Sequence, residues 1–227
     1  MKPVLYKYFD FSENFKKSLR NGYLWFSRPT EFNDPFEFKL QVDEDLGDSD
    51  ILEYFNLYKK LSVTSSSSKK VDFNKVLLKY KTDPKKFTEF YLAPFAEYIR
   101  NFGVCCFSSI NDNILMWSHY ANSHRGLVIE FDPKQLYESI YELNDSAQIT
   151  TIRTVTYSNK FPLIKISSSL EKTSLEIEKA VITKSKDWRY EKEMRIISQK
   201  SGKHLINRNC IKRIYLDINF QRKIKEN

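Results

Sequence analysis

The sequence predicts an α+β fold with a mixed, mainly antiparallel sheet flanked by helices. Short apolar runs of strand length occur near both ends and in the centre of the chain, for example at residues 4–8, 104–108 and 194–198. Longer stretches with helical spacing of apolar residues separate these runs. The sheet must therefore be assembled from N-terminal, central and C-terminal strands.

The N-terminal segment is predicted to hold strands over residues 4–8 and 23–27, with a helix over 13–20 between them. Ser12 is a typical helix N-cap, and Asn21-Gly22 is a typical helix end. In the turn-rich link that follows, Pro35 keeps Asp34 out of helical geometry.

A helical insertion over residues 48–102 is expected within a single domain that spans residues 1–227. Apolar spacing predicts its helices over 50–61, 72–81 and 84–102. Four consecutive serines interrupt this pattern, so residues 62–70 are expected to form a mobile loop whose deletion costs little stability.

Residues 103–132 predict two buried strands, 104–108 and 127–131, around a helix over 111–121. Ser109 and Asp112 have the spacing of a helix-capping pair. The helix is apolar nearly all round, which indicates a buried helix. We therefore expect His119 to be desolvated against aromatic side chains, as a core residue or as part of a site.

The remaining chain is predicted to contain a helix over 133–141, a strand over 149–157, a helix from Ser168 or Thr173 towards Lys184, and strands over 194–198 and 211–216. Glu191 and Glu193 stand directly before the strand at 194–198. On an extended segment Glu191, Glu193 and Arg195 would share one face, where Arg195 can pair with a carboxylate as ordinary structure.

The composition is that of a folded globular protein, with 41% hydrophobic and 15% aromatic residues. No apolar run approaches a membrane span, and the first residues lack the apolar segment of a secretion signal. We therefore expect a cytoplasmic protein without a membrane partner. The three cysteines, Cys105, Cys106 and Cys210, lack CxxC spacing, so neither a disulfide framework nor a metal site is indicated.

The net charge of +8 resides in the C-terminal end, because residues 184–227 hold 13 Lys or Arg against 5 Asp or Glu. Such asymmetry is typical of a protein with a phosphate-rich partner, either nucleic acid or a dinucleotide. It is also typical of an ordinary lysine-rich surface in water. Charge alone leaves both interpretations open.

Three motifs occur in order along the chain: LYKY followed by NDPFE, then MWSHYANSHRG, then WRYEKEMRI. Together they resemble the bacterial family catalogued as domain of unknown function 2971, and the resemblance covers roughly residues 4–216. That family label carries no established activity, so function has to be argued from the residues.

A more distant resemblance is to the ADP-ribosyltransferase superfamily. It is carried by a first strand with Tyr6, Lys7 and Tyr8, by Ser108 at the end of the central strand, and by Glu191-x-Glu193 before a strand. The resemblance implies an enzyme that uses NAD, in a toxin or phage-defence setting, with Lys7 at the position that holds the ribose. Glu193 would hold the ribose 2′-hydroxyl beside the developing oxocarbenium charge, and Glu191 would orient the acceptor.

The candidate site combines these motif residues with polar and aromatic residues near them. Catalytic roles are assigned to Glu193, Glu191 and His119. Cofactor binding is assigned to Tyr6, Lys7, Tyr8, Ser108 and Tyr120. Substrate binding is assigned to Asn33, Asp34, Glu37, Trp117 and Arg195. The partner would be a small dinucleotide or a macromolecular acceptor.

Two other functions remain open at the level of sequence. The first is an acid-base or metal-dependent hydrolase, including a nuclease, that uses His119, Asp34, Glu37 and Glu193, although no HxxxH spacing indicates a metal. The second is a non-catalytic module whose basic C-terminal end binds nucleic acid or a protein.

Overall fold

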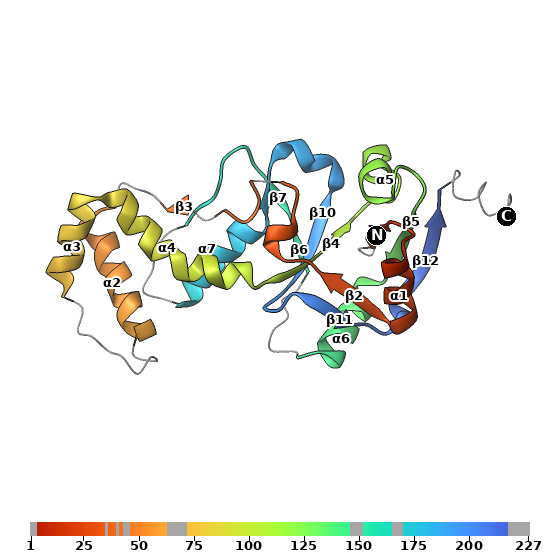
Figure 1. Cartoon of the computed structure of the whole chain (residues 1–227), viewed down its shortest axis with the longest axis horizontal. Coiled ribbons are helices and arrows are strands. Elements are labelled where there is room, and N and C mark those ends of the chain that lie inside the picture. The colour runs from red at the N-terminus through yellow and green to blue at the C-terminus, as the bar shows by residue number, and fades with distance from the viewer. Residues whose placement is uncertain are drawn as a thin grey trace. The chain divides into compact units, whose positions relative to one another are not determined.

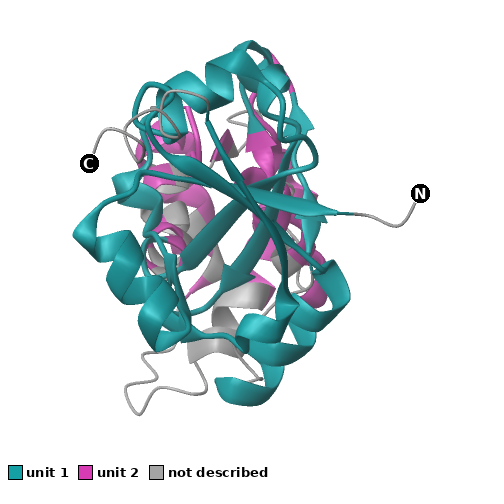
Figure 2. Ribbon diagram, turned by 90° about the vertical axis from the view of Figure 1, so that its right-hand side faces the viewer, with its two compact units in different colours: residues 1–35, 100–157, 184–227 teal, residues 36–99, 158–183 magenta. Residues whose placement is uncertain are grey.

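The computed structural model describes residues 4–34, 36–39, 41–42, 46–62, 72–145, 152–164 and 170–217. The chain divides into two compact units (Figure 2). Unit 1 comprises residues 1–35, 100–157 and 184–227, and unit 2 comprises residues 36–99 and 158–183. Each unit is described here by itself.

Unit 1 is built on a six-stranded sheet with the strand order β12-β5-β1-β4-β10-β6. Figure 1 labels β12, β5, β4, β10 and β6 of this sheet. The strands are β1 (Leu5–Phe9), β4 (Gly103–Ser108), β5 (Leu127–Phe131), β6 (Arg153–Thr154), β10 (Glu193–Ser198) and β12 (Ile211–Leu216). Neighbouring strands in this sheet are antiparallel. The predicted α+β fold, with a sheet assembled from the two ends and the centre of the chain, is confirmed.

One face of this sheet carries the main hydrophobic core of unit 1. It packs against α1 (Glu13–Asn21), β2 (Tyr23–Phe26) and α6 (Pro133–Leu143). Phe15, Phe26 and Leu136 from these elements lie in one buried cluster with Phe107 and Phe131 of the sheet. Because side chains alternate along a strand, only every second strand residue faces this core.

Local sequence signals determine the ends of α1 as expected. The Ser12 side chain accepts a hydrogen bond from the Phe15 amide at the N-terminus of the helix. Gly22 ends the helix with φ 62°, a left-handed conformation that glycine adopts without steric cost. The chain then enters β2, which pairs with β11 (Gly202–Leu205).

The opposite face of the sheet is covered in part by the short helix α5 (Ile114–Tyr120). The helix begins after Asn113, whose side chain accepts from the Met116 amide, and is shorter than the predicted span of 111–121. The expectation of an all-round buried helix is wrong, because Ile114 is 72% exposed and Leu115 47% exposed. Such a short helix buries only the side that meets the sheet, here mainly Met116.

A tight left-handed turn connects α5 to β5. Asn122, Ser123 and His124 have φ values of 48°, 52° and 65°. Gly126 closes the turn, since a Cβ atom there would lie 2.1 Å from the Phe9 carbonyl oxygen. Only glycine fits so close to the backbone of β1.

The remaining elements of unit 1 are short. The strand expected over 149–157 is represented by β6 and by β7 (Thr156–Tyr157), while residues 146–151 lie outside the described part of the chain. The chain returns to unit 1 through β9 (Thr183–Lys184) and the 3-10 helix η3 (Lys186–Glu191). Two further 3-10 helices, η1 (Pro29–Glu31) and η4 (Arg208–Cys210), lie in connections.

Unit 2 contains mainly helices. They are α2 (Asp48–Ser62), α3 (Phe73–Thr82), α4 (Pro84–Arg100) and α7 (Leu170–Val181), of which the last residue of α4 belongs to unit 1. A short parallel pair, β3 (Gln41–Val42) and β8 (Leu163–Ile164), completes the described part of this unit. The predicted serine-rich loop lies almost wholly outside the described residues. None of the described helices is long and apolar enough to cross a membrane.

Candidate functional site

A polar row crosses five strands on the α5 face of the sheet. The strand register pairs, in succession, Arg213 with Glu130, Glu130 with Tyr6, Tyr6 with Ser108, and Ser108 with Glu193. Directly paired residues of neighbouring strands point to the same face of a sheet. Residues from the two ends and the centre of the chain are therefore brought into one line, at the end of which Glu193 lies.

The backbone around Glu193 is held by groups from two neighbouring segments. Lys192, with φ 44°, ends η3 and turns the chain into β10. The Glu193 amide donates to the Tyr157 hydroxyl at 2.8 Å, and its carbonyl oxygen accepts from the Val155 amide at 3.0 Å. Because its backbone is held on both sides, the Glu193 side chain has a defined direction.

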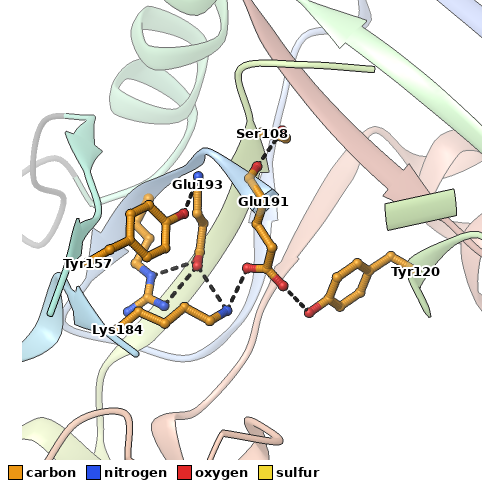
Figure 3. Close-up of polar contacts among 7 residues, drawn as sticks. Ser108, Tyr120, Tyr157, Lys184, Glu191 and Glu193 are labelled. Carbon is orange, nitrogen blue, oxygen red and sulfur yellow. Dashed lines mark hydrogen bonds and ion pairs between the residues drawn. The ribbon is translucent and has the colours of Figure 1, made fainter. Parts of the chain in front are cut away.

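Glu193 forms the centre of a buried ion network (Figure 3). Arg195 Nε lies 2.7 Å from Oε1 and Arg195 Nη2 lies 3.1 Å from Oε2, so the guanidinium binds both carboxylate oxygens. Lys184 Nζ also binds Oε2, at 3.1 Å. Burial by itself would raise the pKa of Glu193, but the Arg195 and Lys184 cations outweigh it and lower the pKa to about 2. Glu193 is therefore ionised throughout the neutral range.

Glu191 lies beside this network in a different environment. Its Oε2 accepts from Lys184 Nζ at 2.6 Å, and its Oε1 accepts from the Tyr120 hydroxyl at 2.6 Å (Figure 3). Burial raises the pKa of Glu191, the nearby Glu193 charge raises it further, and Lys184 offsets only part of the increase. The two carboxylates thus have pKa values shifted in opposite directions, a pattern found where one group stays charged and its neighbour exchanges a proton.

Lys184 and Tyr157 belong to this site, and the sequence analysis identified neither. The ammonium group of Lys184 is buried, bridges both carboxylates, and lies 4.8 Å from the centroid of the Trp188 ring. Two buried carboxylates next to one arginine require a second cation, because an unpaired buried charge is costly. That requirement could have directed attention to the lysines near Glu191, but it could not have selected among Lys184, Lys186 and Lys192.

Ser108 contributes to the site through its hydroxyl group. Ser108 Oγ donates to the Glu191 carbonyl oxygen at 2.6 Å and accepts from the Ile110 amide at 3.1 Å. The residue is fully buried. Its hydroxyl therefore positions the backbone of Glu191.

The three residues of the first-strand motif do not share one face. Tyr6 and Tyr8 lie on the α5 face, where Tyr8 donates to the Ile110 carbonyl oxygen at 3.1 Å and contacts the Trp117 ring edge to face at 5.6 Å. Lys7 points to the opposite face, where its Nζ donates to the Cys106 carbonyl oxygen and lies 5.4 Å from the Phe107 ring. The assignment of Lys7 to the same site as Glu193 is therefore wrong, because alternation along β1 separates them.

The residues predicted on α5 lie at the outer side of the site. His119 is exposed, and its ring lies 6.3 Å from Tyr120 and 6.4 Å from Tyr190. The expectation that His119 is desolvated is wrong, because it lies on the part of α5 that faces away from the sheet. Trp117 is half-buried, and its Nε1 donates to the Asn111 carbonyl oxygen at 2.8 Å.

The candidates from the Asn-Asp-Pro segment differ in burial. Asn33 is exposed, whereas Asp34 and Glu37 are buried. In the part of the chain that the structure describes, no group of three or more His, Cys, Asp or Glu side chains is placed to hold a metal ion. The oxygens of Glu191 and Glu193 are instead bound by Lys184 and Arg195.

Comparison with known proteins gives a match to one family model over part of the chain. No match is found among curated proteins or among solved structures. Residues 116–196 match the family described as Protein of unknown function (DUF2971). The matched segment runs from α5 into β10 and includes Tyr120, Lys184, Glu191, Glu193 and Arg195. The match supports the family resemblance of the central and C-terminal motifs, and the segment that resembles domain of unknown function 2971 is the one that contains the buried carboxylate pair.

Proposed function

We propose that this protein is an enzyme that breaks an N-glycosidic bond and transfers the sugar, in the manner of an ADP-ribosyltransferase with NAD as substrate. The observation that carries the proposal is the pair of adjacent buried carboxylates with oppositely shifted pKa values. Glu193 is held ionised by two cations, and Glu191 is poised to exchange a proton.

The geometry favours Glu191 over Glu193 as the reacting carboxylate. Both oxygens of Glu193 are bound by Arg195 and Lys184, so this group is best suited to hold Lys184 in place. Both oxygens of Glu191 are also bound, but Oε1 is bound by the hydroxyl of Tyr120, which is uncharged and only partly buried. We therefore assign Glu191 as the general base and Glu193, Lys184 and Arg195 as positioning residues, which reverses the emphasis that sequence resemblance placed on Glu193.

In the proposed reaction the bond between the ribose C1′ and the nicotinamide nitrogen breaks, and its electron pair leaves with nicotinamide. An acceptor hydroxyl or water then forms the new bond to C1′ and gives its proton to Glu191. A base with a raised pKa is efficient near neutral pH, and a positioned base typically contributes about a hundredfold or more in rate. Lys7 lies on the other face of the sheet and has no role in this scheme, whereas Tyr6 shares the row of Ser108 and Glu193.

The test is nicotinamide release from NAD by the wild type and by three variants. Glu191→Gln should lower the rate about a hundredfold with little loss of stability, because the amide can still accept from Lys184. Glu193→Gln should lower stability as well as rate, because Arg195 and Lys184 lose a buried charge partner. Glu142→Gln, at an exposed position of α6, is the matched control and should change neither quantity.

A wild-type protein that neither binds NAD in a thermal-shift assay nor releases nicotinamide would overturn this function. The ion network would then be purely structural. In that case any effect of Glu191→Gln would be confined to stability.

A further inference from the structure

Three aromatic rings form a strip on the outer side of the carboxylate site. Trp188 and Tyr190 of η3 have ring centroids 6.0 Å apart, and Tyr190 and His119 of α5 have centroids 6.4 Å apart. His119 is exposed, and the other two rings are only partly buried. The planes of neighbouring rings are inclined by 39° and 37°. We call this set the aromatic strip.

Cationic residues alternate with the aromatic strip in sequence. The segment KDWRYEK places Lys186, Arg189 and Lys192 next to Trp188 and Tyr190. All three cations are exposed, and in the described part of the chain no carboxylate forms an ion pair with any of them. The one exposed carboxylate of the segment, Asp187, accepts a hydrogen bond from Ser185.

Partly exposed aromatic rings that alternate in sequence with exposed cations suit one class of ligand. Single-stranded nucleic acid offers bases that stack on aromatic rings and phosphates that attract cations, whereas a duplex keeps its base faces covered. The surplus of basic over acidic residues in this protein also lies in residues 184–227, which include this segment. We propose that single-stranded nucleic acid binds along the aromatic strip, with bases stacked on Trp188 and Tyr190 and phosphates next to Lys186, Arg189 and Lys192.

The proposal goes beyond NAD chemistry and rests on other residues. An acidic protein would use the cations but would gain little from a row of ring faces, so the aromatic strip favours the nucleic acid. Stacking and charge also make separable contributions: loss of a ring lowers affinity at every salt concentration, whereas loss of the cations weakens the dependence on salt.

The test is fluorescence anisotropy with labelled single strands of about 12 thymidine or uridine nucleotides, within the usual range of site sizes. Three phosphate contacts at about −0.7 each predict a slope near −2 in a plot of log affinity against log salt. Trp188→Ala and Tyr190→Ala should each lower affinity about tenfold with little change in slope. Trp188→Phe should retain most of the affinity, which separates stacking from damage to the Lys184 environment.

The control substitutions of a lysine and of a tryptophan lie in other parts of unit 1. The triple variant Lys186→Gln, Arg189→Gln and Lys192→Gln should bring the slope of log affinity against log salt close to zero. The control Lys17→Gln, at an exposed position of α1, should keep most of the wild-type slope. Trp25→Ala, at a 50% exposed tryptophan of β2, should bind like the wild type.

Equal affinity for duplex, equal affinity for polyglutamate, or unchanged binding by both alanine variants of the aromatic strip would each overturn the proposal. Glu191→Gln should bind the single strand like the wild type. If the wild type binds the single strand but releases no nicotinamide, the enzymatic proposal fails and this one stands.

Discussion

The two faces of the six-stranded sheet differ in what makes them stable. One face is a continuous apolar core in which Leu5, Phe107 and Phe131 pack with side chains of the covering helices. The other combines apolar contacts around Met116 and Tyr8 with the fully buried Arg195 and the buried carboxylates. Burial of apolar surface stabilises the first face directly, whereas buried charges on the second are stable only while every partner is present. The stability of the second face therefore depends on a complete set of charged partners, whereas that of the first does not.

The largest expected effect belongs to the apolar face. Phe131→Ala should lower the free energy of unfolding by about 4 kcal/mol, because it empties a position that is 1% exposed. The loss should be the same at every pH between 5 and 8, since no titrating group is removed. Urea denaturation across this range measures it, and a loss below about 1 kcal/mol would show that this face is not the main core.

Breaking the ion network should have a smaller effect that depends on pH. Lys184→Met should cost about 3 kcal/mol at neutral pH, because Glu191 and Glu193 are then left with only Arg195. The raised pKa of Glu191 means that the folded state binds its proton more readily than the unfolded state does. The loss should therefore shrink as the pH falls from 8 to 5. Lys17→Met, at an exposed site, is the control. If the stability loss of Lys184→Met did not change with pH, protonation of Glu191 would not be linked to the ion network.

His204, on the apolar side of the sheet, should make the stability of the protein fall as the pH is lowered, which is opposite to the pH dependence expected from Glu191. The imidazole stacks on Phe26 at 4.0 Å, and its Nε2 lies 2.9 Å from Ser198 Oγ. Burial lowers the pKa of His204 in the folded protein, so its contribution to stability is complete above the unfolded value of about 6.5 and is lost as the pH falls below it. His204→Gln should flatten the fall in melting temperature below pH 6.5. A steeper fall in the variant would mean that protonated His204 stabilises the fold.

The smallest expected effect lies in the left-handed turn after α5. Ser123→Gly should stabilise the protein by about 0.5 kcal/mol, because glycine adopts the observed φ of 52° without strain. The matched change Ser118→Gly, within α5, should destabilise by about 0.5 kcal/mol, because glycine weakens a helix. The denaturation midpoint should shift in opposite directions in the two variants. Shifts in the same direction would contradict this account of the turn.

Regular elements were predictable wherever pattern and capping signals agreed. The strand at 127–131 and the helix after Ser12 occur as the sequence indicated, because an apolar run and a side-chain cap act over a few residues. The two-residue strands β3, β8 and β9 were not predicted, since such short segments carry no periodicity. The burial of α5 was predicted wrongly because composition does not reveal which side of a short helix meets the sheet.

The candidate site was predictable only in its motif residues. Glu191, Glu193, Arg195, Ser108 and Tyr120 were identified from motifs, and the structure joins them through hydrogen bonds and one sheet register. Lys184 was missed and Lys7 was assigned to the wrong face. Both errors concern the direction in which a side chain points, and a sequence motif gives no information on that direction.

The sequence by itself determined the α+β class, the apolar strands and the position of a Glu-x-Glu pair before one of them, because these depend on local pattern. Only the tertiary structure decided that Tyr6, Ser108 and Glu193 share a row, that Lys184 bridges the carboxylates, and that Glu191 and Glu193 differ in proton affinity. Strand register and burial bring together residues about a hundred positions apart. Charge interactions and pKa shifts depend on those distances and on the exclusion of water.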